Sequence, residues 1–173
     1  MEIGFAVPAA MVRTVLASAK EGGKSVRRPW FGARLQVVSA DIAESMGMER
    51  PTGALVVSTL PGSPAGAAGL KSGDVIVAVD GRAIEDPDSF GYRFATRPLG
   101  GRVAVTILRG GKRADIPVEL AAAPERPARE ALTVASNSPL RGATIVNLSP
   151  AVAEELSLQG LSKGVAVQEL DQG

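Results

Sequence analysis

Residues 63–81 read Ser-Pro-Ala-Gly-Ala-Ala-Gly-Leu-Lys-Ser-Gly-Asp-Val-Ile-Val-Ala-Val-Asp-Gly, and this stretch decides the fold. A short turn that begins at Ser63 leads to a Gly-Asp pair and then to the apolar run 75–79. A short apolar run between two turn signals is typical of a buried strand. The Asp80-Gly81 turn that follows marks the end of this strand. The stretch therefore predicts a β-rich domain.

The segments on either side extend this pattern in both directions. Alternating or continuous apolar residues predict further strands, and Asp41 with Glu44 predicts a capping box for a short helix. Another helix is expected to begin at the Asp86-Pro87 pair. The expected strands are 3–7, 33–38, 54–57, 75–79, 103–108 and 114–120, and a hairpin turn across residues 109–112 is expected to join the last two. The expected helices are one from Pro8, 41–47 and 87–96. The predicted fold class is mainly β with short helices.

The composition restricts the possible functions. The 173 residues carry a formal net charge of +1 and include no cysteine and no histidine. A nearly neutral chain does not indicate nucleic-acid binding. Without histidine, this chain alone cannot assemble a Ser-His-Asp triad, and the usual His/Cys zinc sites are excluded. We therefore expect no catalytic residue, no metal site and no cofactor.

The last third of the chain repeats the beginning of the domain. Residues 31–35 align with 141–145, and residues 43–48 align with 153–158, both at an offset of 110 positions. The Pro/Ala-rich stretch 122–137 before this repeat is typical of a linker. Residues 138–173 thus match the first third of a second domain. We expect this part to be disordered, to lean on the first domain, or to form a homo-oligomer with another copy.

The core stretch 63–81, together with Arg28-Pro29-Trp30-Phe31-Gly32-Ala33 upstream, resembles a PDZ domain of the bacterial HtrA/Deg (protease Do-like) serine proteases. The resemblance implies a partly open β-barrel or sandwich capped by two helices, followed by a truncated second PDZ-like repeat. It implies four segments: the terminal strand and exit helix of a missing protease domain at 1–24, a PDZ domain at 25–121, the linker at 122–137, and the start of a second PDZ domain at 138–173.

The resemblance also implies a peptide-binding site. A Gly-containing loop can direct backbone N–H groups at a carboxylate, and the strand after it can pair with an extended peptide. Trp30 and Phe31 have an alternative interpretation as core or junction residues, and Phe90 and Phe94 have one as residues packed beneath the sheet. The candidate peptide- and carboxylate-binding residues are Trp30, Phe31, Gly32, Ala33, Leu35, Val37, Phe90 and Phe94.

The implied function is a peptide-binding module of an envelope serine endopeptidase in protein quality control. Its partners would be C-terminal or unfolded peptides and the missing protease domain. Residues 1–4 lack a signal-peptide pattern, so the periplasmic location rests on the resemblance alone. The alternative is an oligomerisation or scaffold module with an unused groove. A self-sufficient enzyme with a Ser/Lys pair is a third interpretation, but no lysine lies in a recognisable nucleophile motif.

Overall fold

The computed structural model describes residues 27–135, 139–158, 161 and 163–170. The strand expected at 3–7 and the helix expected from Pro8 lie outside these residues. The chain divides into two compact units, unit 1 up to Ala122 and unit 2 from Ala123.

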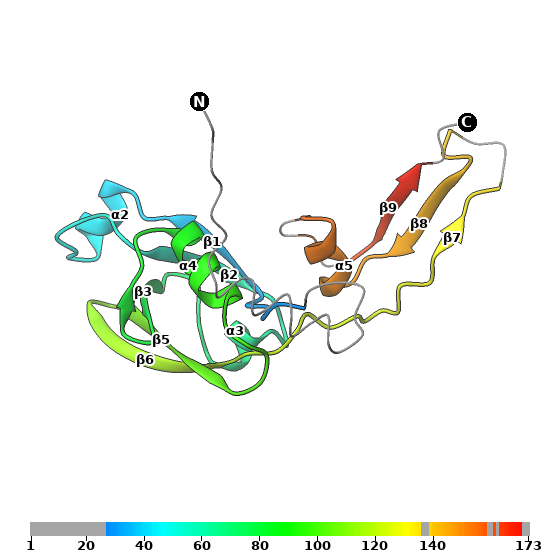
Figure 1. Cartoon of the computed structure of the whole chain (residues 1–173). Coiled ribbons are helices and arrows are strands. Elements are labelled where there is room, and N and C mark those ends of the chain that lie inside the picture. The colour runs from blue at the N-terminus through cyan, green and yellow to red at the C-terminus, as the bar shows by residue number, and fades with distance from the viewer. Residues whose placement is uncertain (1–26, 136–138, 159–160, 162, 171–173) are drawn as a thin grey trace, which may run out of the picture. The chain divides into compact units, whose positions relative to one another are not determined.

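The elements of unit 1 (Figure 1) are β1 (Ala33–Val37), α2 (Ala40–Ser45), β2 (Ala54–Thr59), α3 (Pro64–Ala67), β3 (Val75–Val79), β4 (Arg82–Ala83), α4 (Pro87–Ala95), β5 (Arg102–Arg109) and β6 (Lys112–Glu119).

The strands of unit 1 form one antiparallel sheet in the order β1-β2-β3-β5-β6, and β4 pairs with β3 beside this path. The first and last strands of the path do not pair with each other, so the sheet is open. The predicted fold class, mainly β with short helices, is therefore confirmed, with an open sheet rather than a closed barrel. This order leaves β1 at one end of the sheet.

The core of unit 1 is mostly aliphatic, in keeping with an aromatic content of 3% in the sequence. Val56, Ile76, Val105 and Ile107 are fully buried on the central strands. Burial of each such side chain contributes about 1.5–3 kcal/mol relative to an exposed one. A smaller cluster around Val38, Ala43 and Val75 packs beside α2.

Local sequence signals explain most element boundaries. The β5–β6 hairpin turns at Gly110-Gly111, as expected, and both glycines have positive φ. Asp86 caps α4, because its carboxylate accepts the Ser89 N–H at 2.7 Å. The capping box expected at Asp41 is wrong. The Ser39 hydroxyl caps α2 instead, because it accepts the Ile42 N–H at 3.3 Å and the helix begins one residue earlier.

The Gly-Asp pair before β3 holds a buried charge. The Asp74 side chain is 2% exposed, and its two oxygens accept Arg109 Nε and Nη2, each at 2.6 Å. The Lys71 N–H donates to the same carboxylate at 2.8 Å. The hydrogen bond to Asp74 raises the pKa of Arg109. A buried carboxylate needs such partners, and here they tie the loop before β3 to the end of β5.

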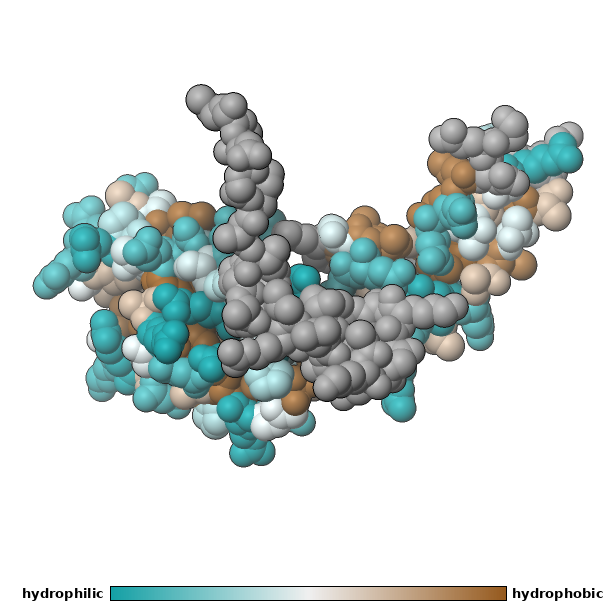
Figure 2. Space-filling view, viewed as in Figure 1, coloured by the Kyte–Doolittle hydropathy of each residue, from teal (hydrophilic) through white to brown (hydrophobic). Residues whose placement is uncertain are grey.

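Unit 2 is a small sheet with one helix on it. Its elements are β7 (Leu132–Thr133), β8 (Ala143–Asn147), α5 (Pro150–Glu155) and β9 (Val165–Leu170), and the strand order is β7-β8-β9. The buried core consists of Val146, Leu148, Val152, Ala153 and Ala166. The large apolar side chains of Leu132, Val165 and Leu170 in this unit are exposed. Figure 2 shows hydrophobic residues on the surface of the unit.

Candidate functional site

The candidate site begins at the loop of residues 30–33, which leads into β1. The Phe31 carbonyl accepts the Ala65 N–H at 3.0 Å, and the Gly32 carbonyl accepts the Leu60 N–H at 2.9 Å. These two bonds fix the loop against α3 and the end of β2. In the described part of the chain, the N–H groups of Phe31 and Gly32 form no hydrogen bond with another protein group. The loop therefore offers two adjacent backbone donors that the fold does not use.

Only glycine fits at position 32. Its φ is +71°, and a Cβ built there would collide with the Cβ of Ser63. Ser63 is fully buried, and moving it aside would disturb the cap of α3, because its hydroxyl accepts the Gly66 N–H at 3.1 Å. The sequence singled out Gly32, but not the role of Ser63 in holding the loop. The Ser-Pro pair at the start of α3 is the signal that could have found it.

Beyond the loop, β1 has an unused edge. Ala33 lies opposite Thr59, and the adjacent bond from Leu60 to Gly32 makes Ala33–Thr59 a non-hydrogen-bonded pair. The N–H of Ala33 therefore points away from β2. Among the described residues, β1 pairs with no strand besides β2. The loop therefore supplies consecutive free N–H groups, and the outer edge of β1 supplies backbone groups with which another strand could pair.

An aromatic cluster lies beneath this edge. The ring centroids of Phe31 and Phe90 are 4.6 Å apart, those of Phe31 and Phe94 are 5.1 Å apart, and those of Phe90 and Phe94 are 5.5 Å apart. The exposed fractions of Phe90 and Phe94 are only 2% each. Helix α4, which carries both rings, contacts β1, β2 and β3. The two phenylalanines therefore pack in the core of unit 1, next to β1.

The predicted site residues fall into two groups. Phe31, Phe90 and Phe94 belong to one core cluster, against which the partly buried Ala33 and Leu35 of β1 also pack.

Trp30 and Val37 lie apart from this cluster. Trp30 is 8% exposed, and its N–H donates to the Ala121 carbonyl at 2.8 Å, where the chain leaves the sheet. Val37 is 62% exposed at the far end of β1. A direct role of any of these residues in binding stays a prediction.

Asp86, at the start of α4, has a structural role. Hydrogen bonds from the Ser89 backbone and side chain lower the pKa of Asp86, which fits its role as the helix cap. The described residues contain no group of three or more His, Cys, Asp or Glu side chains placed to hold a metal ion. No helix in the described ranges has the length and hydropathy needed to cross a membrane.

Residues 29–120 match the family described as the PDZ domain. The chain belongs to the PDZ domain family. This PDZ chain is 39% identical over 122 residues to a probable periplasmic serine endoprotease DegP-like protein of Rhizobium meliloti (strain 1021), covering 70% of the chain and 24% of that protein. It is 34% identical over 176 residues to the protein of the same description from Pseudomonas putida (strain W619), covering 100% of the chain and 36% of that protein.

A solved structure agrees with these relatives. The HtrA-type protease AlgW with a decapeptide matches with a TM-score of 0.56 and 30% identity, over 70% of this chain and 37% of that one. The PDZ region is therefore of the HtrA/Deg type, which confirms the resemblance found in the sequence. The chain spans about a quarter to a third of the length of the two curated relatives.

Proposed function

We propose that the PDZ domain at residues 25–121 captures the exposed C-termini of peptides by strand addition to β1. The observation that carries this proposal is the pair of unused N–H groups at Phe31 and Gly32, beside the unpaired edge of β1. The carboxylate of the peptide would accept these donors and the outward N–H of Ala33. The peptide backbone would then pair with the rest of β1, a recognition mode known for PDZ domains.

The expected affinity is modest. Burial of one apolar C-terminal side chain contributes about 1.5–3 kcal/mol. A dissociation constant in the micromolar range corresponds to about −8 kcal/mol, so the ladder bonds and the carboxylate must supply the remainder. Such weak capture suits a module that samples many chain ends.

The aromatic cluster supports a preference for small C-terminal residues. Phe31, Phe90 and Phe94 lie at the start of β1 and on α4, the two elements that would flank the last side chain of the peptide. Their rings pack against each other and leave little of themselves exposed. We therefore expect peptides that end in alanine or valine to bind better than peptides that end in leucine or phenylalanine.

The parent of this domain would be a periplasmic serine endoprotease of protein quality control. Two relatives carry the description periplasmic serine endoprotease, and this chain has no histidine for a catalytic triad. The PDZ domain would therefore regulate a protease domain that lies outside this chain, with residues 1–24 as the end of that domain. The fragment itself would not hydrolyse proteins.

The decisive experiment is calorimetric titration of the chain with peptides that end in a free carboxylate, each paired with its C-terminally amidated twin. The proposal predicts micromolar binding of the free acids and at least a tenfold loss on amidation. Equal affinity of both forms would exclude carboxylate capture. If no peptide binds and the mass of the chain rises with concentration, the oligomerisation module becomes the better explanation.

A further inference from the structure

Unit 2 repeats the first elements of unit 1 residue for residue. β8 (Ala143–Asn147) and α5 (Pro150–Glu155) have the bounds of β1 and α2 shifted by 110 positions, and β9 (Val165–Leu170) has the bounds of β2 shifted by 111. Pairing between the strands is also the same, with an irregularity at the equivalent step in each sheet. The serine that caps each helix is equivalent too. β8 is therefore the structural counterpart of the peptide-binding strand β1.

The loop before β8 is the counterpart of the carboxylate loop. Gly142 corresponds to Gly32, and both have positive φ, +81° and +71°. The outer edge of β8 consequently corresponds to the edge of β1 where we place the peptide. In unit 1 the described residues leave that edge unpaired, whereas in unit 2 it is paired.

A segment of the chain itself occupies the outer edge of β8. Leu132 and Thr133 of β7 pair antiparallel with Ile145 and Thr144. Nearer the other end of β8, the Asn147 N–H donates to the Arg129 carbonyl at 2.8 Å. Residues 129–134 thus cover the edge along its whole length.

The same segment also bonds to the loop through Gly142. The Val134 N–H donates to the Ala143 carbonyl at 2.9 Å, and the Gly142 N–H donates to the Val134 carbonyl at 2.9 Å. The donor that corresponds to the free N–H of Gly32 is therefore already used. The Val134 carbonyl oxygen stands where the carboxylate of a bound peptide would stand, and the segment runs in the direction expected of such a peptide.

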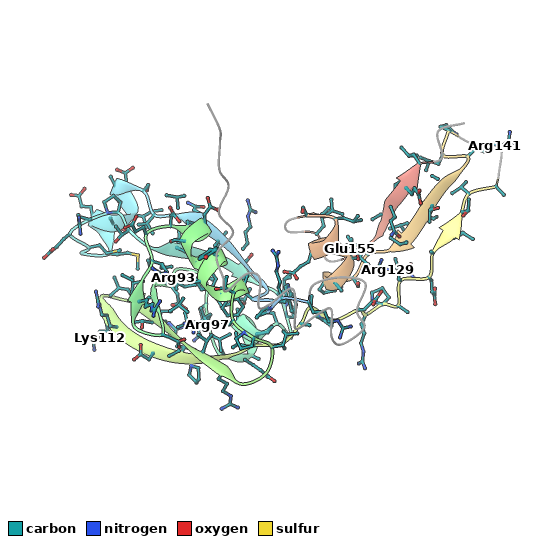
Figure 3. The ribbon with its side chains drawn as sticks, in the orientation of Figure 1. Arg93, Arg97, Lys112, Arg129, Arg141 and Glu155 are labelled. Carbon is teal, nitrogen blue, oxygen red and sulfur yellow. The ribbon has the colours of Figure 1, made fainter. Side chains whose placement is uncertain are left out.

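An ion pair holds the beginning of this segment. Arg129 Nη1 and Nη2 donate to the two carboxylate oxygens of Glu155 on α5, and Arg129 Nε also donates to Glu125 at 3.1 Å. Figure 3 shows Arg129 and Glu155 beside each other. The pair anchors the segment to the helix of the unit whose strand edge it covers.

From this we propose that residues 129–134 act as a built-in ligand of the second repeat and close its strand edge to C-terminal peptides. The proposal rests on the proposed function of unit 1, because it assigns the same recognition mode to β8. It has a quantitative consequence: the chain binds one C-terminal peptide, through unit 1, although it contains two copies of the binding strand.

A disulfide can test the pairing of β7 directly. The chain has no cysteine, so a Thr133→Cys/Thr144→Cys pair would be the only thiols. The bonds at Val134 make Thr133–Thr144 a non-hydrogen-bonded pair, whose Cα separation of about 4.5 Å suits a disulfide. Thr133→Cys/Glu169→Cys is the matched control. Glu169 lies on β9, one strand further away at about 10 Å, and should not crosslink.

The closing experiment combines crosslinking with titration of the full chain. We expect rapid oxidation of the 133/144 pair, little oxidation of the control pair, and a stoichiometry of one peptide per chain with β7 locked or unlocked. Two peptides per unlocked chain and one per locked chain would overturn the proposal, as would equal crosslinking of both pairs.

If no peptide binds at all, the proposed function of unit 1 fails. In that case two measurements still test whether β7 covers β8. They are the crosslinking of the 133/144 pair and the hydrogen-exchange rate of the Val134 amide, which should be at least tenfold lower than in an unstructured peptide.

Discussion

The substitution Gly32→Ala tests how the carboxylate loop is held. At φ of +71° an alanine costs about 1–2 kcal/mol relative to glycine. Its Cβ would also collide with the Cβ of Ser63. This atom is bonded directly to the backbone, so it cannot rotate out of the way as the end of a long side chain could. Displacing Ser63 weakens the cap of α3, which is worth about 1 kcal/mol. We therefore expect unit 1 to lose about 2–3 kcal/mol of stability.

Urea unfolding and thermal unfolding measure this loss. For a domain of this size, each kcal/mol shifts Tm by about 4–8 °C, so Tm should fall by about 10–20 °C. Gly91→Ala is the matched control. Gly91 lies within α4, where an added Cβ meets no atom within 4 Å, and helix propensity predicts a gain of about 0.5–1 kcal/mol.

The same two variants separate stability from binding. Below its unfolding transition, Gly32→Ala should weaken the binding of free-acid peptides at least tenfold, whereas Gly91→Ala should leave it unchanged. A Gly32→Ala chain with normal stability and normal affinity would refute the claim that glycine is needed in this loop.

Three further predictions follow from particular contacts. Asp74→Asn should cost about 2–4 kcal/mol in urea unfolding, because it breaks the paired bonds to Arg109, and a loss below 1 kcal/mol would contradict this. Phe94→Leu should open space beside β1 and raise the ratio of the affinities for leucine-ended and alanine-ended peptides about fourfold, which is the value of one buried methylene. An unchanged ratio in calorimetric titration would contradict the claim that the aromatic cluster limits the size of the last peptide side chain. The hydrogen bond from Arg129 lowers the pKa of Glu155. The stability that this contact gives unit 2 is therefore fully present above the ordinary pKa of glutamate, and it is lost as the pH falls through the lowered pKa. Exchange of the Val134 amide, corrected for its intrinsic pH dependence, should therefore accelerate in acid, and Glu155→Gln should remove that acceleration.

The sequence predicted those elements whose signals are local. The apolar run 75–79 became β3 with the expected bounds, and Gly110-Gly111 placed the β5–β6 hairpin, because only the turn residues and the strand pattern matter there. The cap of α2 was misplaced because Ser39 and Asp41 are both good capping residues. The choice between them depends on where the chain leaves β1, and the local pattern does not contain that information.

The site was predicted less completely than the fold. Spacing placed Phe90 and Phe94 on one helix face, but it could not tell whether that face lines a groove or fills the core. The structure adds that both rings pack against Phe31. β7 was missed for a different reason: its pairing with β8 uses backbone groups, and the Pro/Ala-rich composition of 122–137 indicated only a linker.

The central claim is that the N–H groups of Phe31, Gly32 and Ala33 receive a C-terminal carboxylate. The most direct measurement is a ¹H–¹⁵N NMR titration of the chain with an alanine-ended peptide and with its amidated twin. The account predicts that the free acid shifts the amide signals of these three residues more than any others, and that the amidated peptide at the same concentration does not. Equal shifts with both peptides, or shifts confined to other residues, would contradict it.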